Sequence, residues 1–97
     1  MIVLNVTYKC RPELREEFLE AILREGIDID CRAEAGNVKY EYYLPFDGSG
    51  DELLLVEKWR DADALALHFK QPHYQRLMQL KERYVLETTV DRLSPKP

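Results

Sequence analysis

The chain has 97 residues, which is the length of one domain and is enough to bury a real hydrophobic core. It is 45% hydrophobic and 33% charged, the composition of an ordinary globular protein rather than of a disordered chain. Its net charge of -4 lacks the basic character of a nucleic-acid binder, so we expect no DNA or RNA partner. We expect one domain over residues 1–97, with a flexible tail at residues 93–97.

The first residues, MIVLNVTYK, lack the features of an export signal or a membrane anchor. The apolar run is short, Asn5 interrupts it, and no basic leader or small-residue cleavage site is present. Cys10 and Cys31 are too few for a disulfide framework and form no CxxC pair. These features predict a cytoplasmic protein, without a membrane partner, that carries two free thiols of structural role.

The first half of the chain alternates between strand and helix patterns. Residues 2–9 are rich in β-branched side chains and predict a strand. Pro12 suits a first helical turn, and the apolar stripe that follows predicts a helix from Pro12 to about Glu25, or on towards Ala33. Gly36 marks the end of this region, and NVKYEYYLPF then predicts a second strand.

The second half begins after the loop DGSGD. The segment ELLLVEKW is the most hydrophobic strand and should lie centrally, and Asp61 should cap the helix that begins with ADALALHF. Pro72 should start another helix that runs to about Tyr84, and LETTVDRL predicts the last strand. The predicted order is therefore βαββ(αα)β.

This order predicts an α+β, ferredoxin-like split βαβ fold, with a four-stranded antiparallel sheet and helices on one face. In the central strand Leu54 and Val56 point to one face, while Glu57 and Trp59 share the other face with two leucines. Both faces thus carry large apolar groups. A second copy packed sheet on sheet would cover the face without helices, so we expect a homodimer.

The segments AEAGNVKYEYY and LLLVEKWRDADALALHFKQPHY resemble the antibiotic-biosynthesis monooxygenase (ABM) domain family. The resemblance extends from about residue 2 to residue 93 and rests on four features: an Ala-Gly turn, a Glu-x-Trp strand end, an Ala-Leu-x-x-His helix and a Pro-His-aromatic helix start. It implies a dimeric α/β barrel with a small-molecule pocket between sheet and helices. Similar members include cofactor-independent oxygenases of polyketides and quinols, haem-degrading enzymes, and an isomerase of a phosphorylated quorum-sensing signal.

Two histidines are the first candidates for chemistry. The resemblance aligns His68 with a histidine on a family helix, and a neutral imidazole can accept a proton near pH 7. His73 follows Pro72 in a first helical turn, where contact with the backbone is the main interpretation and a pocket contact is the alternative. The two lie five residues apart with a proline between them, and no cysteine or carboxylate cluster in the sequence completes a ligand set, so no metal site is expected.

Glu57 and Trp59 share one strand face. Trp59 is interpreted as core or pocket wall. An inward Glu57 needs a partner or a raised pKa, and pairing across the sheet is the favoured interpretation.

Asn5 interrupts an apolar strand, and its amide is a candidate to enter the pocket. In haem-degrading members an early asparagine acts with a tryptophan and a histidine. By spacing, His68 stands where their tryptophan would lie and Met78 where their haem-binding histidine would lie, which argues against haem degradation.

No GxGxxG or phosphate-binding loop is present, so no cofactor is predicted. The leading hypothesis is an oxidoreductase, a cofactor-independent monooxygenase of a small electron-rich aromatic such as a quinol or polyphenol. In it His68 is the base or anion partner, Asn5 and either Tyr40 or Tyr42 orient the substrate, and aromatic side chains wall the pocket. The wall residues are Trp59, Phe69 and Tyr74. His73 is a further candidate for contact with the substrate.

Two alternatives remain open. An isomerase of a small phosphorylated ketone would use the same base and would need a cation such as Lys39 or Arg32 to hold phosphate. A non-catalytic small-molecule-binding dimer with a stress-response role would keep the pocket without the chemistry.

Overall fold

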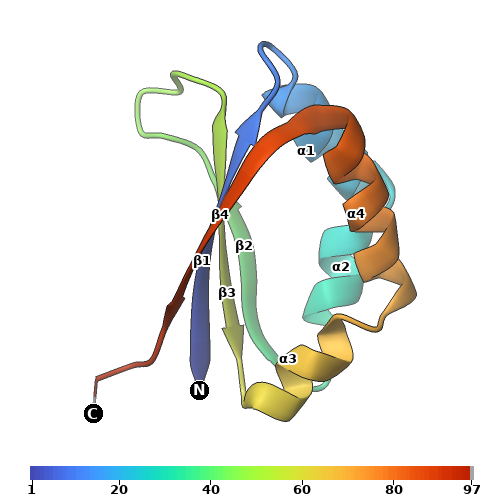
Figure 1. Ribbon diagram of the computed structural model, residues 1–97. Helices are drawn as coiled ribbons and strands as arrows, with labels where there is room; N and C mark the ends of the chain where they lie inside the picture. The colour runs from blue at the N-terminus through green and yellow to red at the C-terminus, as the bar shows by residue number, and fades with distance from the viewer. Residues whose placement is uncertain (97) are drawn as a thin grey trace.

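The computed structural model describes residues 1–96 and shows an α+β fold, with a four-stranded antiparallel sheet covered on one face by helices (Figure 1). The elements are β1 (Ile2–Cys10), α1 (Arg15–Arg24), α2 (Ile27–Arg32), β2 (Asn37–Tyr43), β3 (Glu52–Trp59), α3 (Ala62–His68), α4 (Pro72–Tyr84) and β4 (Val85–Leu93). The strand order β2-β3-β1-β4 is that of a ferredoxin-like sheet, which confirms the predicted fold class. None of the helices in the described part of the chain is long and apolar enough to cross a membrane.

The alternation of β3 separates the two faces of the sheet as predicted. Glu57 and Trp59 are buried towards the helices, together with Leu53 and Leu55. Leu54, Val56 and Lys58 are half-buried on the opposite face, which no helix covers (Figure 1). The predicted homodimer, in which a second sheet covers this face, stays a prediction.

The core lies between the sheet and the helices. Phe18 of α1 is fully buried and meets Tyr8 of β1 edge to face, with ring centroids 5.5 Å apart. The same ring lies 5.9 Å from Tyr84 at the end of α4. Aromatic pairs of this kind contribute about 0.5–1.5 kcal/mol each beyond the burial of their area, so Phe18 ties both long helices to the sheet.

The helical region after β1 differs from the prediction at both ends. The helix α1 begins at Arg15 rather than Pro12, because residues 11–14 form a turn in which Glu13 has a left-handed φ of 66° and donates its backbone N–H to Asp51. Gly26, with φ 69°, then separates α1 from α2. Glycine adopts this backbone conformation without steric cost, so the predicted extension towards Ala33 is a second helix.

The remaining boundaries follow the sequence more closely. Asp61 caps α3 through a 2.8 Å bond from the Ala64 backbone N–H, and α4 spans the predicted residues. β2 ends at Tyr43, so the expected strand is three residues too long. Leu93 belongs to β4, residues 94–96 have no regular structure, and Pro97 lies outside the described residues.

Candidate active site

A cavity of about 160 Å³ lies between the inner face of the sheet and helices α3 and α4. Its walls are mostly apolar and aromatic, with Leu4 and Val6 from β1 and Leu77 from α4. The polar side chains that reach it include His68 and Glu57. A mainly apolar pocket with a few convergent polar groups is the usual form of a small-molecule site.

His68 is held rigidly in this wall. It is only 2% exposed and lies on the buried side of α3 with Ala64 and Leu65, which precede it by four and three residues. Its ring lies against Trp59 with centroids 4.5 Å apart and meets Tyr74 edge to face at 5.2 Å. The imidazole is therefore fixed in orientation by packing before any substrate enters.

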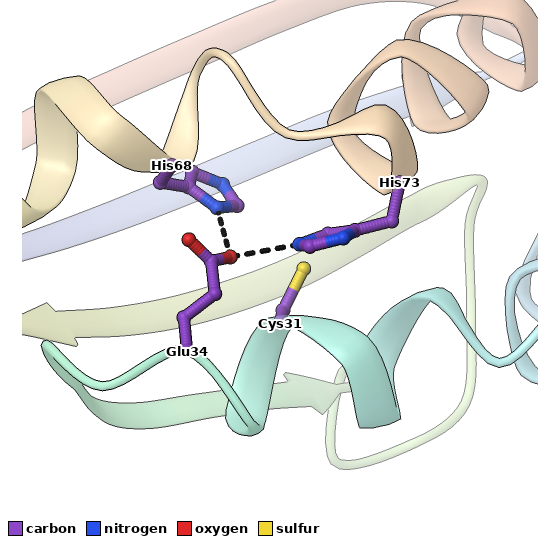
Figure 2. A group of neighbouring side chains, drawn as sticks. All are labelled: Cys31, Glu34, His68 and His73. Atoms are coloured by element: carbon purple, nitrogen blue, oxygen red, sulfur yellow. Dashed lines mark hydrogen bonds and ion pairs between the residues drawn. The ribbon is translucent and has the colours of Figure 1, made fainter.

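Glu34 sets the protonation pattern of His68. Its Oε2 lies 2.7 Å from Nδ1 of His68 and 2.8 Å from Nε2 of His73 (Figure 2). An ionised carboxylate only accepts hydrogen bonds, so both imidazoles donate an N–H to it. The neutral His68 ring then carries its hydrogen on Nδ1, and its Nε2 keeps a free lone pair.

A glycine brings Glu34 to this position. Gly36 follows the turn that carries Glu34, and its backbone carbonyl accepts a 2.9 Å bond from the Arg60 N–H at the end of β3. A Cβ at Gly36 would lie 2.2 Å from the Cβ of Ala64 on α3, so only glycine allows this close approach. The Ala-Gly turn thus places Glu34 beside the C-terminal end of α3.

Glu57 lies on the other side of the His68 ring. Its Oε1 accepts a 2.9 Å bond from Nε1 of Trp59 and lies 4.0 Å from Nε2 of His68. Burial raises the pKa of Glu57 to about 7, against the lowering effect of the Trp59 bond. The expected pairing across the sheet is wrong, because its neighbours in register are Leu4 and Tyr40. A carboxyl with this pKa can accept or donate a proton near neutral pH.

The environment also keeps His68 neutral. Burial lowers its pKa, and the hydrogen bond to Glu34 opposes that effect without cancelling it. A neutral imidazole with a free Nε2 is the form that accepts a proton.

Tyr40 and Tyr42 lie side by side on β2, with their hydroxyl oxygens 3.4 Å apart. Tyr40 lines the cavity, whereas Tyr42 does not and meets the Tyr40 ring edge to face, with centroids 5.8 Å apart. Burial raises the pKa of both hydroxyls, so they stay protonated and can donate hydrogen bonds.

The structure brings only some of the predicted site residues together. His68, Tyr40, Phe69 and Tyr74 line the cavity. Trp59 supports His68 from the core, while His73 lies beyond Glu34.

Asn5 does not reach the cavity. It lies between Leu4 and Val6, which both line the cavity, and successive side chains of a strand point to opposite faces. Its neighbours in register, Val56 and Asp91, lie on the face without helices. The expected pocket position of Asn5 is therefore wrong.

Lys81 is a cavity residue that the sequence reasoning missed. It lies four residues after Leu77 on α4, its Nζ lies 5.4 Å from the centre of the Tyr8 ring, and burial lowers its pKa. The spacing from Leu77 was the available signal. Lys39 and Arg32, the predicted phosphate-binding cations, lie elsewhere: Lys39 pairs with Glu41, and Arg32 pairs with Asp28 and donates to the Tyr40 carbonyl.

The structure also changes the expectation that no metal site is present, because it brings four potential ligands together. Cys31, Glu34, His68 and His73 each present one ligand atom, and these atoms lie within 4.8 Å of one another. The premise that no cysteine or carboxylate joins the two histidines is therefore wrong, because the fold supplies both from the segment around α2. Burial raises the pKa of the Cys31 thiol to about 12, so it is protonated in this arrangement.

A ferredoxin-like sheet with a small aromatic cavity beneath its helices, and with a buried imidazole and carboxyl in that cavity, defines a class of small α+β proteins. The chain belongs to the antibiotic biosynthesis monooxygenase family, whose model matches residues 1–80. This confirms the resemblance found in the sequence.

Known proteins agree with this assignment. The chain is 38% identical over 75 residues to a Bacillus subtilis protein named "Putative monooxygenase YcnE", covering 77% of this chain and 76% of the relative. Among solved structures it is similar to PA3566 from Pseudomonas aeruginosa, with a TM-score of 0.85, 27% identity and coverage of 99% and 94% of the two chains. Rv0793 from Mycobacterium tuberculosis gives a TM-score of 0.84 at 29% identity, with coverage of 99% and 95%.

Proposed function

We propose that the protein is a cofactor-independent monooxygenase of a small, electron-rich phenol or quinol. The observation that carries this proposal is the direction of the His68 ring: Nδ1 donates to Glu34, and Nε2 lies on the side of Glu57 in the cavity wall. Membership of the family and the name of the Bacillus subtilis relative support an oxygenase.

The first step is the removal of a phenolic proton. Nε2 of His68 accepts it, with Glu57 as the adjacent acid–base group, and the resulting anion is a far better electron donor than the neutral phenol. Lys81 is a basic side chain of the cavity and favours the negative charge. Tyr40 offers a hydroxyl that can orient the anion.

The oxygen chemistry balances without a further reductant. The anion passes electrons to O₂, and the oxygen bonds to a ring carbon that carries two hydrogens in the keto tautomer. The peroxide anion that forms takes back the proton held by His68 and becomes a hydroperoxide. Loss of water from the resulting hydroperoxide converts this CH₂ into C=O. One oxygen atom enters the substrate, the other leaves as water, and the substrate supplies all four electrons.

The cavity argues for a small substrate. Its volume of about 160 Å³ is below the roughly 300–1,000 Å³ of pockets for drug-sized ligands. A single-ring phenol or quinol therefore fits better than a polycyclic polyketide. The apolar walls keep water away from the reacting anion.

Oxygen uptake by the chelator-treated protein tests the proposal. A panel of single-ring quinols should consume O₂ faster than their spontaneous oxidation, whereas the matched O-methylated compounds, which lack the acidic proton, should not respond. Equal rates with both sets, or no uptake with any quinol, would reject the proposed reaction.

The isomerase and the binding-only protein remain as alternatives. Lys81 is a candidate to hold a phosphate, and proton exchange on a phosphorylated ketone would show this reaction. If neither oxygen uptake nor proton exchange is observed, but a quinol raises the melting temperature, the protein is a binding protein without catalytic activity.

A further inference from the structure

Four potential metal ligands from four segments of the chain lie close together, and His68 is one of them (Figure 2). Cys31 comes from α2, Glu34 from the turn before β2, His68 from the end of α3 and His73 from the first turn of α4. Cys31 and the two histidines are buried, and the side chain of Glu34 is only 12% exposed. Thiolate, imidazole and carboxylate are the three ligand types that Zn²⁺ binds in proteins.

The hydrogen bonds of the cluster show how a cation would fit. Oε2 of Glu34 lies 2.7 Å from His68 and 2.8 Å from His73, and two imidazole protons bridge these gaps. In a tetrahedral zinc site, with bonds of about 2.0–2.3 Å, neighbouring ligand atoms lie roughly 3.3–3.7 Å apart. The ligand atoms of the cluster are between 2.7 Å and 4.8 Å apart, a range that includes the separations of a tetrahedral site. Side-chain rotations that move these atoms by about an ångström would therefore complete the site.

We propose that Cys31, Glu34, His68 and His73 bind one divalent transition-metal ion, with Zn²⁺ as the best match to the ligand set. The ion replaces the bridging protons: the Cys31 thiol loses its proton to solvent, and each neutral imidazole moves its hydrogen to the ring nitrogen that does not bind. Zn²⁺, one thiolate and one carboxylate then sum to zero charge, which suits a buried site.

The surface offers a route to these ligands. An open depression of about 380 Å³ is lined by Glu34 and His73, with Gly36 and Ala64 beside them. It lies apart from the substrate cavity, whose lining includes His68 but none of the other three ligands. A metal ion can therefore approach without passing through the substrate cavity.

The two sites share one ring through different atoms. Metal on Nδ1 of His68 places the ring hydrogen on Nε2, so the metal-loaded ring cannot accept a proton from a substrate. The metal site itself does not depend on the proposed oxygenase, because its test measures the metal directly and uses no substrate.

Titration of the chelator-stripped, full-length chain with Co²⁺ and Zn²⁺ tests the site. We expect one Co²⁺ per chain, with intense visible bands of tetrahedral cobalt and a near-ultraviolet thiolate-to-cobalt charge-transfer band, all removed by one equivalent of Zn²⁺. Zn²⁺ should also raise the melting temperature of the wild-type chain.

Variants identify the ligands. Cys31→Ser should abolish the charge-transfer band, and His73→Gln should weaken Zn²⁺ binding by roughly tenfold or more. Cys10→Ser is the matched control, since Cys10 is the other buried free thiol and lies outside the cluster, and it should leave binding unchanged. If Cys31→Ser fails to fold by circular dichroism, His73→Gln and the cobalt spectrum of the wild type decide the question.

Three results would overturn the site. They are a cobalt spectrum without a thiolate band, binding of several weak ions per chain, and wild-type affinity in folded His73→Gln.

Discussion

The two sides of the His68 ring carry the same kind of group and differ in what that group does. On one side Glu34 accepts two imidazole hydrogen bonds, at 2.7 and 2.8 Å. On the other side Glu57 accepts one bond from Trp59 and stays 4.0 Å from the ring. Two glutamates beside one imidazole thus have different roles. Glu34 orients the ring through its hydrogen bonds, whereas burial raises the pKa of Glu57 to about 7 and makes it an acid–base group.

Replacing the ring itself should give the largest effect. His68→Gln keeps a similar polar volume but cannot titrate near neutral pH, so turnover of the best quinol should fall by roughly 10²–10⁴-fold. The melting temperature should fall by only several degrees, because the amide can still donate to Glu34 and only the ring contacts with Trp59 and Tyr74 are lost. Steady-state oxygen uptake and thermal unfolding of the chelator-treated protein measure both quantities. A turnover of His68→Gln within a few-fold of the wild type would contradict the role of His68 as the base.

Glu57 should make stability depend on pH. Its pKa is raised in the folded chain from an ordinary value of 4.5 to about 7, so its contribution is fully present below pH 4.5 and is lost as the pH rises towards about 7. The loss should amount to about 3 kcal/mol. Glu57→Gln keeps an acceptor for Trp59 and cannot ionise, so its free energy of unfolding should lack this fall.

Denaturant unfolding of both chains between pH 4 and pH 8, with a chelator present, gives the comparison. If the free energy of unfolding changes with pH in the same way in the wild type and in Glu57→Gln, the pKa of Glu57 is not raised by folding.

Glu34 should act on catalysis through His68. Glu34→Gln replaces a charged acceptor of two N–H groups by a neutral amide, whose oxygen accepts more weakly and whose NH₂ group can turn towards the rings. We therefore expect His68 to be held less firmly and kcat to fall by roughly 10–100-fold. KM should change little, because Glu34 does not line the cavity. A rise in KM with normal kcat would instead place Glu34 in substrate binding.

Weakening the helix that carries His68, without touching either glutamate, should give the smallest effect. Asp61→Ala removes the cap of α3, a 2.8 Å bond to the Ala64 N–H, and should lower the free energy of unfolding by about 1 kcal/mol. Oxygen uptake at temperatures well below unfolding should stay within a few-fold of the wild type. A loss of activity as large as that of His68→Gln would show that the activity depends on α3 as a whole.

Local patterns predicted most of the fold. The alternation of β3, the Asp61 cap and the Pro72 helix start each depend on residues close in sequence, and the structure confirms all three. The start of α1 depends instead on a contact between Glu13 and Asp51, 38 residues apart, which no local pattern contains.

The candidate site was less predictable for the same reason. Glu34 lies 34 residues from His68 and 39 from His73, so only the folded chain shows that they meet. Asn5 is different, because its place between Leu4 and Val6 was visible in the sequence and already indicated the opposite face. The interruption of an apolar strand by a polar residue suggested a pocket position, whereas the strand periodicity was correct.

The tautomer of His68 tests the central claim most directly. Two-bond ¹⁵N–¹H correlation spectra of the chelator-treated protein at neutral pH report which ring nitrogen carries the hydrogen. A neutral ring with its hydrogen on Nδ1 and a free Nε2 is the predicted result. A hydrogen on Nε2, or a ring that stays charged at neutral pH, would contradict the assignment of His68 as the base.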